Sequence, residues 1–135
     1  MAKQNRRTFM SNAGKAVAAT GIGLSSNTFP MAEKNEFIHH VYFWLKNSNS
    51  AEDKQKLIEG LKQLSKVKTI RSFHIGQPAD TNRDVIERTY ALSWLLFFKN
   101  AADQESYQTD PIHLDFVKNY SHLWSKVIVY DSVGI

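Results

Sequence analysis

The 135-residue sequence contains no cysteine. Disulfides, thiol nucleophiles and metal or iron–sulfur sites built on cysteine are therefore excluded. The sequence also lacks a membrane span, because its longest mildly apolar run, residues 13–24, is too short and too weakly hydrophobic to cross a bilayer. Internal repeats and low-complexity tracts are absent as well. What remains after an N-terminal leader is about one hundred residues, enough for one domain with a modest core.

Acidic residues are missing from the first 32 positions, which carry the basic residues Lys3, Arg6, Arg7 and Lys15. The other 13 of the 17 basic residues and all 13 acidic residues lie in residues 33–135, which are therefore formally neutral. The basic charge belongs to the leader. The folded part lacks the clustered cationic surface that nucleic-acid-binding proteins use, so we expect no nucleic-acid partner.

Residues 1–32 resemble a twin-arginine export signal. Arg6 and Arg7 are followed by Phe9 and Met10, and then by the mildly apolar run. Export predicts a periplasmic location and a mature chain that starts near residue 33. The alternative is a disordered N-terminal leader on a cytoplasmic protein.

After the leader, the hydrophobic period alternates between two and about 3.6 residues. A capping-box-like start at Ser50 predicts a helix with Leu57, Ile58, Leu61 and Leu64 on one face. The element order predicts an α+β, ferredoxin-like β-α-β-β-α-β fold with an antiparallel sheet and helices on one face. The predicted strands cover residues 37–46, 69–75, 89–98 and 126–133, and the later helical pieces cover residues 100–108 and 111–123.

Both faces of the predicted sheet carry apolar side chains. In the first strand, Val41 and Phe43 lie on one face with His39, and Tyr42 and Trp44 lie on the other. One layer of helices covers only one face of an antiparallel sheet, so the second face needs another partner. We therefore expect a homodimer that packs sheet against sheet around a two-fold axis.

The segment from Tyr107 to His113 is the strongest candidate for chemistry. Asp110 is a preferred N-cap and Pro111 suits the first helical position, so His113 lies in the first turn of a helix. Backbone N–H groups and the positive end of the helix dipole favour a neutral imidazole there. Tyr107 supplies a nearby phenol, and the two side chains form a candidate acid–base pair. The alternative is that His113 only packs at the helix start.

Four segments in this order resemble the stress-responsive α/β-barrel domain family: residues 38–46, 70–76, 107–113 and 127–131. The resemblance covers about residues 36 to 133 and implies a dimeric α+β barrel, with the domain extending over residues 36–135. A plant cyclase of this family closes a linear polyketide by aldol condensation without metal or cofactor. Its tyrosine and two histidines look like Tyr107, His113 and His39 here. Its third-strand histidine falls at about Leu92, so the polyketide substrate cannot be carried over.

His39 and His40 are neighbours on a strand, so they point to opposite faces and cannot bind one ion together. Only one of them can face a pocket. His39 is the candidate by the family match, and a packed core histidine is the alternative. We expect neither a metal site nor a cofactor, because no H-x-x-x-H motif or carboxylate cluster has ligand spacing. Aromatic side chains, among them Trp44, Phe116 and Trp124, are candidates to line a pocket for an apolar or aromatic ligand.

Three functions remain open at this level. The first is a cofactor-independent cyclase- or lyase-type enzyme that acts on a small, partly apolar carbonyl compound through His113 and Tyr107. The second is a stress-protective or ligand-binding dimer without turnover. The third is haem degradation or aromatic oxidation, which other dimeric α+β barrels carry out.

Overall fold

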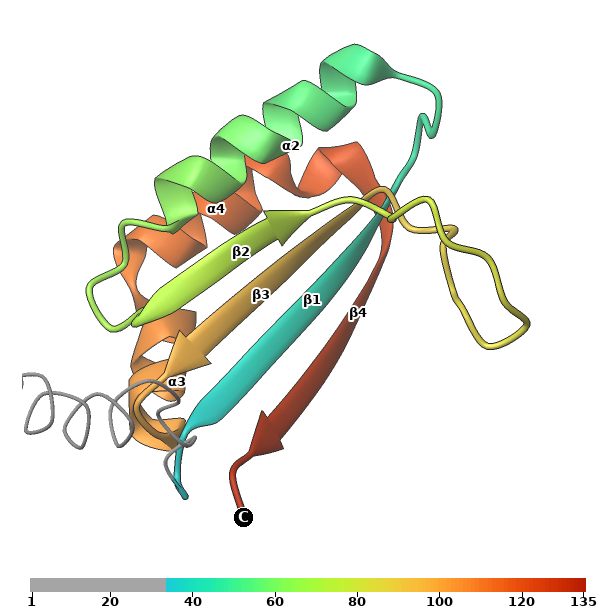
Figure 1. The fold of residues 1–135 in the computed structure, drawn as a ribbon. Coiled ribbons are helices and arrows are strands. Elements are labelled where there is room, and N and C mark those ends of the chain that lie inside the picture. The colour runs from blue at the N-terminus through green and yellow to red at the C-terminus, as the bar shows by residue number, and fades with distance from the viewer. Residues whose placement is uncertain (1–33) are drawn as a thin grey trace, which may run out of the picture. The chain divides into compact units, whose positions relative to one another are not determined.

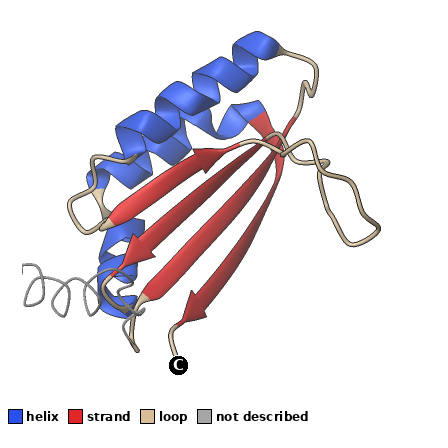
Figure 2. Cartoon of the chain, in the orientation of Figure 1, coloured by secondary structure: helices blue, strands red, loops and turns tan. Residues whose placement is uncertain are grey.

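A computed structural model describes residues 34–135 (Figure 1). They form a four-stranded antiparallel sheet in the order β2-β3-β1-β4, with the helices on one face (Figures 1 and 2). The predicted ferredoxin-like α+β fold is confirmed. The elements are β1 (Phe37–Leu45), α2 (Ala51–Leu64), β2 (Ser72–Gly76), β3 (Leu92–Phe98), α3 (Ala101–Thr109), α4 (Pro111–Tyr120), the 3-10 turn η1 (Ser121–Leu123) and β4 (Trp124–Val133).

Each α-helix within residues 34–135 starts at a residue whose polar side chain caps it. The Ser50 hydroxyl accepts a hydrogen bond from a backbone N–H in the first turn of α2, and the Asn100 side chain does the same for α3. At α4, Asp110 Oδ1 accepts from the N–H of Ile112 at 2.8 Å, and Pro111 occupies the first turn. These caps satisfy N–H groups that have no partner within the helix.

The core lies between the sheet and the helices. Leu57 and Leu61 of α2 are fully buried, and Val41, Phe43 and Leu45 of β1 are buried against the helices, as their spacing predicts. These apolar side chains supply most of the drive to fold.

The contact between α2 and α4 depends on a glycine. A Cβ atom on Gly60 would lie 2.9 Å from atoms of the Tyr120 ring, which is closer than a real Cβ approaches a neighbour. The missing side chain therefore lets α4 lie close to α2, and so helps to hold α4 over the sheet.

No element among residues 34–135 covers the other side of the sheet, which we call the open face (Figure 1). The strand registers place 14 residues there. Most of those on β1 and β3 are partly buried by their neighbours. The open face consists of Ile38, His40, Tyr42 and Trp44 of β1, Ser72, His74 and Gly76 of β2, Ser93, Leu95 and Phe97 of β3, and Lys126, Ile128, Tyr130 and Ser132 of β4.

Several predicted boundaries are wrong by two or three residues. The second strand starts at Ser72 rather than residue 69, because Ile70 N–H bonds to the Val67 carbonyl in a turn. The third starts at Leu92 rather than residue 89, because Thr89 is held in the β2–β3 loop by side-chain hydrogen bonds. The last helix ends at residue 120 rather than 123, because residues 121–123 form the turn η1. Strand β4 starts at residue 124 rather than 126.

The predicted leader, residues 1–32, lies outside the described residues. Within residues 34–135, no helix is long and apolar enough to cross a membrane.

Candidate functional site

A cavity of about 150 Å³ lies between the sheet and the helices. It brings together five of the six predicted site residues: His39, Tyr107, His113, Phe116 and Trp124. They come from β1, the end of α3, the start of α4, the middle of α4 and the start of β4. The other lining residues are Val41, Phe43, Leu64, Trp94, Gln108, Val117, Val127 and Val129.

His39 lies on the helix side of β1 and is 6 % exposed. Its Nδ1 atom forms a 2.5 Å hydrogen bond with Oδ1 of Asp131, the residue directly opposite on β4. A carboxylate only accepts hydrogen bonds, so Nδ1 carries the proton in this contact. The Nε2 atom is then the nitrogen that His39 can offer to a ligand in the cavity.

The ring of Tyr107 lies close to the rings of both histidines. Its ring centroid is 4.7 Å from that of His113 and 5.8 Å from that of His39. The buried Trp94 Nε1–H donates to the Tyr107 oxygen at 3.1 Å, so the tyrosine's own proton remains free to be donated. Burial raises the pKa of Tyr107 well above its usual value, which outweighs the opposite effect of the Trp94 hydrogen bond. The phenol is therefore a neutral donor at ordinary pH.

His113 is the third residue after the cap of α4, as its spacing from Asp110 predicts. Burial lowers its pKa from 6.5, and the nearby His39 adds to this effect. The Gln108 backbone and Asp110 act in the opposite direction. Within residues 34–135, the buried Nδ1 atom has no partner at full hydrogen-bond geometry, so the effect of the Gln108 backbone is that of a nearby polar group. A neutral imidazole that lines a cavity is a suitable proton acceptor.

One wall of the cavity is aromatic. The Phe43 ring packs against Trp124 with centroids 5.0 Å apart, and Phe116 stacks on Trp124 at 5.7 Å. Two of the other lining residues, Val117 and Val129, are 40 % and 45 % exposed, so the cavity reaches the surface along the β4 edge. The cavity therefore combines an apolar, aromatic wall with the polar side chains of His39, Tyr107 and His113.

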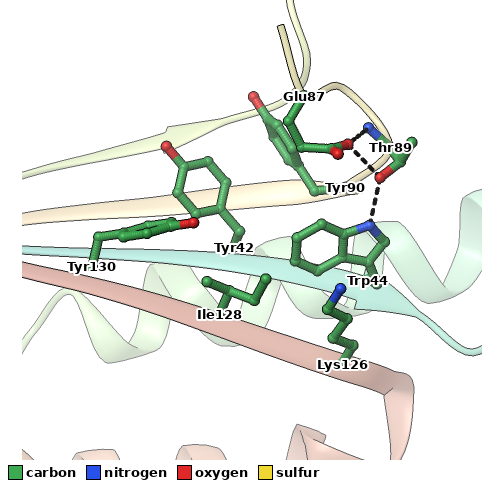
Figure 3. Close-up of a pocket in the computed structure, with 8 residues that line it drawn as sticks. All are labelled: Tyr42, Trp44, Glu87, Thr89, Tyr90, Lys126, Ile128 and Tyr130. Atoms are coloured by element: carbon green, nitrogen blue, oxygen red, sulfur yellow. Dashed lines mark hydrogen bonds between the residues drawn. The ribbon is translucent and has the colours of Figure 1, made fainter. Parts of the chain in front are cut away.

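Trp44, the sixth predicted site residue, does not line this cavity. It lies on the open face, in a separate pocket of about 520 Å³ beside Tyr42 and Tyr90 (Figure 3). Alternation along β1 explains the difference, because Trp44 points away from the side that carries His39 and Phe43.

No group of three or more His, Cys, Asp or Glu side chains within residues 34–135 is placed to hold a metal ion. His40 lies on the open face, so of the two adjacent histidines His39 is the one that reaches the cavity.

The sequence interpretation missed two residues that support the site. Asp131 accepts a hydrogen bond from His39, and Trp94 donates one to Tyr107. The strand register contains the signal for Asp131, because pairing β1 with β4 antiparallel through Val41 and Val129 also places residue 39 opposite residue 131. Nothing local in the sequence links Trp94 to Tyr107.

The sequence model of the stress-responsive A/B barrel domain family matches residues 37–133 of this chain. The chain belongs to this family. A search of curated proteins gave no significant match.

Solved structures share the fold at low sequence identity. A family protein with a ferredoxin-like fold from Mesorhizobium loti is 20 % identical with a TM-score of 0.62, over 74 % of this chain and 97 % of the other. A dimeric ferredoxin-like protein from Bacteroides fragilis is 21 % identical with a TM-score of 0.56, over 73 % and 95 %. The hydroxynitrile lyase of Passiflora edulis is 18 % identical with a TM-score of 0.62, over 75 % and 94 %.

Proposed function

We propose that this family member is a homodimeric, cofactor-independent enzyme that performs acid–base chemistry on a small, neutral, partly apolar carbonyl compound. The observation that carries the proposal is the convergence of His39, Tyr107 and His113 on one cavity between sheet and helices. A lyase with the same fold is consistent with this class of reaction.

The geometry suggests a role for each group. The Tyr107 hydroxyl, held by Trp94, donates a hydrogen bond to the carbonyl oxygen and stabilises the negative charge that develops there. The neutral imidazole of His113, which lines the same cavity, removes the proton next to the carbonyl. His39, oriented by Asp131, offers Nε2 as a second acid–base group on the other side of the Tyr107 ring.

The lining of the cavity limits the substrate. None of the residues that line it is Lys, Arg, Asp or Glu, so an ionised carboxylate or phosphate would be buried there without a counter-charge. A volume of about 150 Å³ suits a molecule of the size of a simple aryl or cyclic ketone, and is far too small for a porphyrin. The cavity therefore favours the carbonyl enzyme over haem degradation.

The dimer forms through the open face in this proposal. The face exposes aromatic side chains and lacks a covering layer within the described chain, and similar structures are named as dimeric.

Export of the protein through a twin-arginine signal remains part of the proposal as well. Sequencing the N-terminus of periplasmic protein should show a start near residue 33, whereas full-length chain found only in the cytosol would remove it.

Proton abstraction can be tested before the natural substrate is known. We expect the protein to catalyse exchange of the methyl protons of acetophenone for deuterium in D₂O, measured by NMR. His113→Gln should slow this exchange by roughly a hundredfold or more, and Tyr107→Phe by about a hundredfold. His122→Gln, at an exposed position on η1, is the matched control and should leave the rate unchanged.

The pH profile gives a second readout. Since the His113 pKa is lowered from 6.5, the base form persists below that pH, and the acid limb of the exchange rate should have its midpoint below pH 6.5. If acetophenone, cyclohexanone and acetylacetone all exchange at the buffer rate, the enzymatic proposal fails. Binding of these ketones without exchange, seen as shifts of the Tyr107 and His113 resonances, would instead assign a ligand-binding dimer.

A further inference from the structure

The open face carries an unusual set of charges. Among the strand residues at positions 34–135, Asp131 is the one carboxylate, and it points to the helix side with His39. The titratable cations on the open face are His40, His74 and Lys126. A positive charge that forms there has no strand carboxylate to pair with.

The two histidines flank one apolar residue. His40 of β1 and His74 of β2 are both paired with Leu95 of the strand between them, so the three side chains form a row across the open face. The ring of His74 lies over Gly76, where an added Cβ would meet it at 2.9 Å. Both histidines therefore lie on the surface that a covering layer would contact.

The surroundings of His40 favour its neutral form. Its Nδ1 atom is 3.2 Å from the Tyr42 hydroxyl, and Tyr130 of β4 lies directly opposite. Burial lowers the pKa of His40, and the nearby His74 and His39 lower it further. The facing residues of β3, namely Ser93, Leu95 and Phe97, carry no charge.

The β2–β3 loop brings one acid toward this side of the sheet. Glu87 accepts hydrogen bonds from the Thr89 hydroxyl and N–H, and Thr89 in turn accepts from Trp44 Nε1, at the end of the face near Lys126 (Figure 3). Glu87 and Lys126 line one pocket, whose lining includes neither His40 nor His74. Hydrogen bonds from Thr89 and the nearby Lys126 lower the pKa of Glu87, so this carboxylate is charged and compensates Lys126 rather than the histidine row.

We propose that the open face is an interface for a second copy of this chain that assembles only while His40 and His74 are uncharged. The inference rests on the homodimer of the proposed function and adds its control by protons. A two-fold, face-to-face contact uses the same surface twice, so it would enclose four imidazoles with no carboxylate from the described strands between them, whereas each Lys126 ammonium lies 4.6 Å from the Trp44 ring centroid and shares a pocket with Glu87. Burying unpaired cations is costly, and the dimer is therefore stable only when the imidazoles are neutral.

The direction of the pH effect follows from this. Covering a histidine without a counter-charge lowers its pKa in the dimer relative to the free chain. Association is then strongest above about pH 6.5, the ordinary histidine pKa, and weakens below it; His40 contributes at a lower pH, because its pKa is already lowered in the free chain. Loss of the dimer below pH 6 is the expected behaviour.

Sedimentation velocity of the full chain at pH 7.5 and pH 5.0, at constant ionic strength, tests the proposal. We expect the dimer Kd to rise about 100-fold or more at pH 5.0. The double variant His40→Gln/His74→Gln should stay dimeric at both pH values, with a change of less than about threefold. His122→Gln is the control on the helix side and should respond as the natural chain does.

The outcomes separate the two proposals. A natural chain that is equally dimeric at both pH values overturns the proton control and leaves the proposed dimer intact. A chain that is monomeric at pH 7.5 and micromolar concentration overturns the dimer itself. If the double variant keeps the pH response, other groups titrate and the assignment to His40 and His74 is wrong. Far-UV circular dichroism at pH 5.0 shows whether the subunits remain folded, because unfolding of the natural chain at that pH would also overturn the inference.

Discussion

Replacing Tyr107 with phenylalanine removes one hydroxyl and keeps the ring, so it isolates the hydrogen bond from Trp94 Nε1 to the tyrosine oxygen. Both side chains are 1 % exposed and the bond is 3.1 Å long. In the variant the indole N–H remains buried without a partner, which costs about 1–3 kcal/mol. We therefore expect Tyr107→Phe to lower the free energy of unfolding by that amount, although phenylalanine is the more apolar residue.

A double-mutant cycle separates this bond from changes in packing. Trp94→Phe removes the donor but also leaves space in the core, so its own cost is larger, about 2–4 kcal/mol. The double variant lacks both polar partners, and its cost should fall short of the sum of the single costs by about 1 kcal/mol. Urea unfolding at one fixed protein concentration measures all four chains, which is needed because dimerisation adds to apparent stability. Additive costs within about 0.3 kcal/mol would refute the hydrogen bond as a stabilising contact and its role in orienting the phenol.

Three further predictions concern the helices and the His39 contact. Ser50→Ala removes the cap of α2 and should lower stability by about 1 kcal/mol, with Ser50→Asp close to neutral as its control, both by urea unfolding. Gly60→Ala should destabilise by about 1–3 kcal/mol despite the better helix propensity of alanine, because the new methyl group meets the Tyr120 ring; a stabilised variant would contradict that contact. Asp131→Asn should reduce acetophenone exchange about 10- to 100-fold, as expected for a residue that orients a reacting imidazole, yet cost less than about 1 kcal/mol, since the carboxylate is 44 % exposed. An unchanged exchange rate would remove Asp131 from the site.

Much of the fold follows from local sequence. The caps Ser50, Asn100 and Asp110 mark helix starts because their side chains serve nearby backbone N–H groups. The two faces of β1 follow from strict alternation, which also separates His39 from His40. Local signals therefore predict the elements, their order and the face that each strand residue occupies.

The contacts that complete the site depend on chain segments far apart. Asp131 reaches His39 across 92 positions, and only the register of two strands brings them together. Trp44 is a different case, because its parity on β1, which is visible in the sequence, already assigns it to the open face, and only its aromatic character made it a candidate for the cavity. The start of β3 at residue 92 also depends on a distant segment, since Trp44 Nε1 donates to the Thr89 hydroxyl across 45 positions. The start of β2 at residue 72 depends on a local turn between Val67 and Ile70 that the predicted strand overlooked.

The pairing of β1 with β4 has a consequence for how the protein is made. The first strand of the domain lies in the middle of the sheet, and one of its two neighbours is the last strand, with Phe37 opposite Val133. A ribosome must therefore release nearly the whole domain before the central strand can gain its second partner, and until then the chain exposes a sheet edge to chaperones and to other nascent chains. Folding should be slow for so small a domain, because its longest loop closes last.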